Sequence, residues 1–296
     1  MTIPREDGRS AEQMRPICAR PAAPSASPIN PPHARQYLTE SIFAPSFVRV
    51  LTEPTARSRS RAVVKTGVIS QAAGSAYVEL DKTKVMCGVY GPRQGGPGTD
   101  KVEFDRGRLD VDVKLATFAT SGPRGKVAQG DAEREFSSIV HRALSGAVMT
   151  ETFPKTTVDV FATVLEANGS ELCATIAAAS AALCEAGVAM RDLVSACTVT
   201  RNRRTGVPGG GADGGAEGGG ADGPNALLLD PVRGEEAAAE AGVTLAYMCR
   251  LGEASQVVAT GTWDGESLDD AVQLAASGCA RVDAALREAL RSSVPA

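Results

Sequence analysis

The sequence predicts an α+β fold in which two β-sheet layers pack against helices that lie between and beside them. Short segments with β-branched or alternating apolar side chains are followed by a segment with helical spacing, and this order occurs twice. Only 4% of the 296 residues are aromatic, whereas alanine and glycine are abundant. The core is therefore expected to consist of aliphatic side chains and of helices that approach the sheets closely.

The first half of the ordered region, residues 46–192, is β-rich and then helical. Strands are expected at residues 61–68, 74–80, 84–90, 109–118 and 157–165, the first three of them antiparallel. Apolar spacing predicts one helix over residues 131–150. A second helix is expected to start at a cap formed by Asn168 or Ser170, to reach Glu185, and to stop at Gly187.

The second half, residues 193–296, repeats this plan. Strands are expected at residues 193–200, 226–230, 243–249 and 256–262, followed by a long helix over residues 267–291.

Two segments have the composition of flexible chain. Residues 1–45 are rich in proline and lack periodicity, which predicts a disordered tail. Residues 206–223 are mostly glycine, alanine and aspartate, which predicts a flexible surface insertion between two strands.

Composition restricts the class of protein. The net charge of -4 gives no general attraction to nucleic acid, so that any RNA contact must come from a local basic patch. The 7 cysteines are scattered without CxxC or zinc spacing and are expected to be reduced, buried thiols. No stretch approaches the roughly 20 apolar residues of a membrane span, and a soluble intracellular protein without metal site or cofactor is expected.

Several motifs together resemble the RNase PH family. They are GSAYVEL at residues 74–80, TKVMCGVYGPR at 83–93, GRLDVDV at 107–113, REF at 134–136 and AGVAMRDLV at 186–194. The resemblance extends over about residues 60–292 and implies the RNase PH fold, which is of the ribosomal protein S5 domain 2-like type. Within the family, ISQAAGSAY at 69–77 and LLLDPVRGEE at 227–236 most resemble a ring subunit of the eukaryotic RNA exosome.

The resemblance also implies a phosphate site at the start of the second helix. Active members use inorganic phosphate to cleave RNA, and they hold it with backbone amides, a hydroxyl and an arginine of a motif similar to Ala-Asp-Gly-Gly-Thr-Arg. The corresponding residues of this chain are Asn168, Gly169, Ser170, Glu171 and Leu172. Glu171 replaces the threonine and would repel phosphate, and Leu172 replaces the arginine and removes its bidentate donor. A vestigial phosphate site is therefore expected.

A second implied site is an acidic pair that assists proton transfer or binds a divalent cation in active members. Glu236 aligns with one acid, whereas Gly242 aligns with the other and supplies no ligand. Glu240 would substitute if the alignment were shifted by two residues. The simpler interpretation is that these glutamates form a solvated helix face.

Candidate RNA contacts are Arg124, Lys126 and Arg134, which flank a segment that faces the central channel in related subunits. Such side chains would neutralise phosphates without reading base sequence. Ordinary surface charge is the alternative.

The resemblance thus implies a non-catalytic exosome subunit. In such a complex six RNase PH-like proteins form a ring, S1- or KH-domain proteins cap it, and RNA is guided to a separate nuclease for 3′-to-5′ processing and degradation, in the nucleus, nucleolus and cytoplasm. The alternatives are a phosphate-dependent 3′-to-5′ exoribonuclease, active alone or with a partner, and a solitary RNA-binding module. The acidic charge and the scarcity of aromatic side chains disfavour the module.

Overall fold

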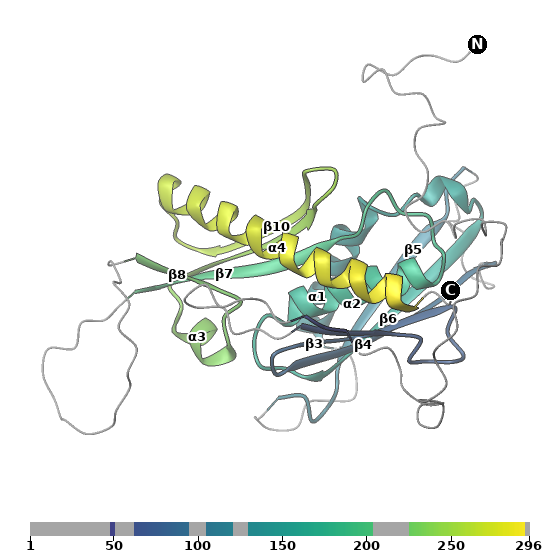
Figure 1. Ribbon diagram of the computed structural model, residues 1–296, viewed down its shortest axis with the longest axis horizontal. Helices are drawn as coiled ribbons and strands as arrows, with labels where there is room; N and C mark the ends of the chain where they lie inside the picture. The colour runs from purple at the N-terminus through teal and green to yellow at the C-terminus, as the bar shows by residue number, and fades with distance from the viewer. Residues whose placement is uncertain (1–47, 51–61, 95–104, 121–129, 204–224, 294–296) are drawn as a thin grey trace, which may run out of the picture.

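The computed structural model describes residues 48–50, 62–94, 105–120, 130–203 and 225–293 (Figure 1). The expected N-terminal tail, the glycine-rich insertion, and the candidate RNA contacts Arg124 and Lys126 lie outside these residues.

The larger of two sheets contains six strands in the order β1-β2-β3-β4-β6-β5. Their bounds are Val48–Val50, Ala62–Thr66, Gly74–Leu80 and Thr83–Gln94 for β1 to β4, Arg108–Leu115 for β5 and Thr156–Glu166 for β6. Strands β1 to β4 and β6 pair antiparallel, whereas β5 pairs parallel to β6. A parallel pair needs a long crossover connection, and the segment between β5 and β6 supplies it with a helix.

The smaller sheet contains four antiparallel strands in the order β10-β9-β7-β8. Their bounds are Ser195–Arg203 for β7, Asn225–Leu229 for β8, Ala241–Met248 for β9 and Glu253–Gly261 for β10. The described residues therefore have the predicted α+β architecture with two sheets.

Four α-helices and one 3-10 helix complete the described fold. They are α1 (Asp131–Ser145), η2 (Thr150–Thr152), α2 (Glu171–Glu185), α3 (Arg233–Ala238) and α4 (Gly265–Ser293). Helix α2 packs on β3 and β4 of the larger sheet and on β7 and β9 of the smaller one, and all its residues from 173 to 183 are buried. Helix α4 lies along both sheets, in contact with β7 and β9 and with β2 (Figure 1). The helices thus lie between and beside the sheets.

Some predicted boundaries were wrong. Helix α1 ends at Ser145, not at residue 150, because Val148 forms a β-bridge with Met190 and leaves the helical path. The strand predicted at 109–118 ends at Leu115. The short elements β1, η2 and α3 were not predicted, since three to six residues carry too little periodicity.

The predicted end of α2 is correct. Gly187 has a φ of 74°, and its amide donates to the carbonyl oxygen of Cys184. This left-handed residue closes the helix at Glu185 as a glycine C-cap does.

Free thiols are found at Cys87, Cys173, Cys197 and Cys279, all buried, and at the half-buried Cys249. Burial raises the pKa of the Cys87 thiol to about 12, which makes it unreactive. Across the residues that the structure describes, none of the helices is both long enough and apolar enough to span a membrane.

Candidate functional site

The N-terminus of α2 is formed by a loop with unusual backbone geometry. Gly169 has a φ of 108° and Ser170 a φ of 52°. A side chain at position 169 would lie 2.4 Å from the carbonyl oxygen of Pro231, so that only glycine fits where α3 approaches this loop. Ser170 is the N-cap residue, as predicted, but its side chain does not cap the helix. Its hydroxyl donates instead to the carbonyl oxygen of Pro231.

Two glutamate side chains accept hydrogen bonds from the amides of this loop. The backbone N–H of Ser170 donates to Oε1 of Glu236 at 2.8 Å, and that of Gly169 donates to Oε1 of Glu171 at 3.3 Å. Free amides at a helix N-terminus favour an anion. Here the anions that satisfy them are carboxylates of the chain itself.

Glu236 is half-buried and lies in a negative environment. Burial raises its pKa above the ordinary value, and the neighbouring carboxylates of Glu171 and Asp230 add to this effect. The Ser170 amide and the guanidinium of Arg233 oppose it. The interpretation of Glu236 as part of a solvated helix face is therefore wrong, because its side chain is half-buried against the α2 N-terminus.

The other residues of the predicted phosphate site serve packing and the connection to α3. Leu172 packs its side chain against the main hydrophobic core. Asn168 donates its amide to Thr83 Oγ1 and accepts from the backbone N–H of Arg233 at 2.8 Å. The segment thus joins β4 to α3 through a hydrogen bond to the Thr83 hydroxyl and a backbone hydrogen bond from Arg233.

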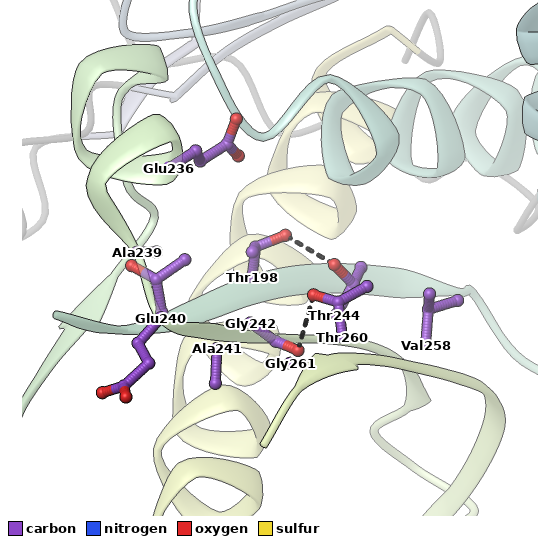
Figure 2. Close-up of a pocket in the computed structure, with 11 residues that line it drawn as sticks. Thr198, Glu236, Ala239, Glu240, Ala241, Gly242, Thr244, Val258, Thr260 and Gly261 are labelled. Carbon is purple, nitrogen blue, oxygen red and sulfur yellow. Dashed lines mark hydrogen bonds between the residues drawn. The ribbon is translucent and has the colours of Figure 1, made fainter. Parts of the chain in front are cut away.

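A pocket of about 380 Å³ opens between α3 and one face of the smaller sheet (Figure 2). The strand register forms its floor, which we call the threonine floor. One row of the floor contains Thr198, Thr244 and Val258, and the next contains Thr200, Gly242 and Thr260. The opposite face of the sheet is covered by α4, where Val199 and Leu245 pack against alanines of the helix.

Glu236 and Gly242, the positions of the predicted acidic pair, line this same pocket. Glu240 also lines the pocket. Figure 2 shows Glu236 above the threonine floor, whereas the side chain of Glu240 points away from the floor. The Glu240 carboxylate lies 4.0 Å from Nη2 of Arg201, at the end of β7. Glu240 therefore does not replace the acid that is absent at Gly242.

The structure thus brings together the residues expected at the two vestigial sites, namely Asn168, Gly169, Ser170, Glu171, Leu172, Glu236 and Gly242. Arg134 lies apart from them in the first turn of α1, exposed and 3.2 Å from Asp131 Oδ1. RNA contact by Arg134 stays a prediction. Within the described residues, no group of three or more His, Cys, Asp or Glu is arranged to hold a metal ion.

Sequence reasoning missed the threonine floor and the hydrogen bond from Ser170 to Glu236. The floor had a signal, because threonines alternate with apolar residues at positions 198, 200 and 244. The hydrogen bond from Ser170 to Glu236 had no signal in the sequence, since it joins residues 66 positions apart.

The two sheets, the central helix α2 and the glycine loop before it define an RNase PH-type protein, and the chain belongs to the RNase PH family. The family model described as "3' exoribonuclease family, domain 1" matches residues 60–189. Three relatives are identical to this chain at more than a third of the aligned positions, and each alignment extends over most of both chains.

An Arabidopsis thaliana protein named "Exosome complex component RRP41-like" is 36% identical over 235 residues, which are 79% of this chain and 81% of its own. The Homo sapiens "Exosome complex component MTR3" is 37% identical over 238 residues, 76% of this chain and 80% of its own. The "Exosome complex component Rrp41" of Cenarchaeum symbiosum is 34% identical over 230 residues, 78% and 85% of the two chains. The crystal structure of rice Rrp46 has the same fold, with a TM-score of 0.61 at 21% identity over 77% of this chain and 93% of that one.

Proposed function

We propose that this chain is a non-catalytic subunit of an RNA exosome core ring, which supports 3′-to-5′ RNA processing and degradation by guiding RNA to a separate nuclease. Its partners are RNase PH-like ring subunits and S1- or KH-domain cap subunits. The RNAs served are rRNA, mRNA and non-coding RNA, and the complex works in the nucleus, nucleolus and cytoplasm. The relatives named exosome complex components support the assembly part of this proposal.

The observation that carries the non-catalytic part is the occupation of the α2 N-terminus by carboxylates. The amides of Gly169 and Ser170 already bind Glu171 and Glu236. An incoming phosphate would have to displace both, and a carboxylate left within about 4 Å of it would oppose binding by roughly 4 kcal/mol at an effective dielectric of 20. Leu172 supplies no compensating positive charge.

The free edge of the smaller sheet supports assembly. Strand β10 is one of the two edge strands, and its residues 253–261 are exposed or half-buried along their whole length. Val257 in this strand is 49% exposed. Exposed edge strands are prone to pair with another chain, and a ring contact would satisfy this one.

Affinity purification with mass spectrometry tests the assembly. The full chain, tagged and expressed in its native cells, should recover RNase PH-like and S1- or KH-domain proteins. A Val257→Lys variant should recover fewer of them, whereas Glu266→Lys, a surface change at the start of α4, should recover the wild-type set. Recovery of no such protein would refute the ring role.

A decay assay tests catalysis separately. The purified chain is incubated with RNA that ends in a 3′-hydroxyl, with and without inorganic phosphate, and nucleoside diphosphates are measured. We expect no phosphate-dependent product. Release of nucleoside diphosphates by the chain alone would contradict the non-catalytic assignment while leaving the ring role intact.

The second candidate is a phosphate-dependent exoribonuclease completed by a partner subunit. The family model, described as a 3′ exoribonuclease family, favours it. Complexes reconstituted with wild-type chain and with Gly242→Val, which narrows the pocket, distinguish the two. Equal phosphorolysis by both complexes places the activity in another subunit, and a loss confined to the variant supports the second candidate.

The RNA-guiding role is assigned to Arg124, Lys126 and Arg134. Crosslinking of RNA in the assembled complex should decrease when these three residues are replaced by glutamine. The salt dependence of RNA binding should also become shallower, because phosphate contacts release counterions.

A further inference from the structure

The pocket above the threonine floor has room for a ligand because of Gly242. A Cβ atom at this position would lie 3.2 Å from Thr260 Oγ1 and 3.7 Å from Thr200 Cγ2. Any larger side chain would therefore enter the space between the two threonines. The glycine that breaks the acidic pair is also the residue that keeps the floor open.

The pocket rim is negative. Glu236 lines it, and the carboxylates of Glu171 and Asp230 are close enough to raise its pKa, with Arg233 as the opposing positive group. No lysine or arginine lines the pocket among the described residues. The electrostatic field at the rim therefore favours a cation.

The floor contains a hydroxyl that lacks a partner. Thr200 is 3% exposed, and its Oγ1 is buried without a hydrogen bond among the described residues. By contrast, Thr198 Oγ1 lies 3.0 Å from both Cys173 Sγ and Thr244 Oγ1, and Thr260 Oγ1 donates to the Gly242 carbonyl oxygen. A buried hydroxyl without a partner is destabilising. The Thr200 oxygen has almost no accessible surface, and the methyl carbon Cγ2 is the atom that faces Gly242. Rotation of the side chain about χ1 to another staggered rotamer would turn the hydroxyl toward the pocket, where a ligand with N–H donors would satisfy it.

We propose that this pocket binds an organic cation, either a guanidinium or a primary ammonium group, between the Glu236 carboxylate and the hydroxyls of the threonine floor. Such groups carry several N–H donors and a positive charge, which match the hydroxyl acceptors and the negative rim. The cation comes either from a basic side chain of a protein or from a free polyamine. The site is independent of the ring role, because it needs only residues of this chain.

Calorimetric titration of the full chain at low ionic strength tests the site. The probes are N-acetylarginine methylamide, its uncharged citrulline counterpart and spermidine. We expect the arginine or the spermidine probe to bind with a dissociation constant of about 1 mM or tighter. The citrulline probe should bind at least about tenfold more weakly than the arginine probe.

Matched variants locate the binding. Glu236→Gln should weaken cation binding by about fivefold or more, whereas Glu235→Gln, which makes the same charge change at an exposed residue of α3 outside the pocket lining, should change it less than about twofold. Thr200→Val removes the unpartnered hydroxyl at constant shape, so that it should weaken binding without lowering the thermal midpoint. Circular dichroism verifies that each variant is folded.

Preference for the arginine probe indicates a protein side chain as the source, and preference for spermidine indicates a polyamine. The proposal is overturned if neither cation shows saturable binding, if citrulline binds as well as arginine, or if the Glu236 and Glu235 variants weaken binding equally.

Discussion

The backbone N–H of Ser170, at the start of α2, donates to Oε1 of Glu236, a residue of α3, across 2.8 Å. Glu236 thereby occupies a position that the electrostatics of a helix N-terminus offer to any anion. The same carboxylate lines the pocket above the threonine floor. A single side chain thus connects the loop where phosphate would bind with the position of the incomplete acidic pair.

Replacement of this carboxylate should change the pH dependence of stability. Because the folded protein raises the pKa of Glu236 above 4.5, the native state holds this proton more tightly than the unfolded state does. The resulting stabilisation is full below the ordinary pKa and is lost as pH rises through the raised one. Glu236→Gln should remove this decline in the thermal midpoint, while the amide oxygen still accepts from Ser170. Glu235→Gln, at an exposed neighbour, should keep the wild-type profile, and a decline that persists in the Glu236 variant would contradict the assignment.

Restoring a positive charge at the α2 N-terminus should create a phosphate site. The triple variant Glu171→Thr, Leu172→Arg, Glu236→Ala removes two repelling carboxylates and adds a bidentate donor. We expect it to bind inorganic phosphate at least about tenfold more tightly than the wild type. Calorimetry measures the affinity, and the double variant that keeps Glu236 is the control, with a smaller gain expected. Equal affinity of the triple and the double variant would show that Glu236 does not block the loop.

The buried ion pair between Asp192 and Arg287 should be a major tertiary connection of α4. Asp192 is fully buried and accepts from Arg287 Nη2 at 2.6 Å and from the backbone N–H of Arg250 at 2.7 Å. Asp192→Ala leaves Arg287 with Asp283 as its remaining partner and removes the buried acceptor of the Arg250 amide, so that it should cost about 3 kcal/mol of unfolding free energy in urea denaturation. In the double variant Asp192→Ala, Arg287→Ala, the loss of unfolding free energy should be smaller than the sum of the two single losses by about 1 kcal/mol or more. Additive losses would exclude coupling, and Arg291→Ala, in the exposed last turn, should be nearly neutral.

Gly74 should not tolerate a side chain, because β3 there touches the end of α2. A Cβ atom at residue 74 would lie 2.3 Å from the backbone nitrogen of Ala186 and 2.4 Å from the carbonyl oxygen of Ala182. Gly74→Ala should therefore lower the unfolding free energy by about 2 kcal/mol or more. Gly146→Ala is the matched control, since its backbone is helical and the nearest atom lies 3.9 Å away. Similar thermal midpoints for both variants would mean that the close contact relaxes without cost.

The helices and most strands could be predicted from local pattern, and so could the identity of the residues at the implied phosphate and acidic positions. The periodicity of residues 131–145 and 171–185 and the glycine at 187 indicate helices and a stop whatever the rest of the chain does, because side-chain spacing and a left-handed residue act locally. The residues that stand at those positions, Leu172 and Gly242 among them, are likewise a matter of residue identity once the motifs are aligned. The sequence by itself therefore determined the α+β class and the side chains available at the implied sites.

Only the tertiary structure decided which groups surround the implied sites. The parallel pairing of β5 with β6, the early end of α1 and the approach of α3 to Gly169 depend on partners far along the chain. The same holds for the Ser170 to Glu236 hydrogen bond and for the threonine floor, which forms from alternate residues of three strands only when their register is set. Hydrogen bonds and like-charge neighbours act over a few ångströms in space, not along the sequence, so that the charge, the protonation and the shape of this site are properties of the folded chain.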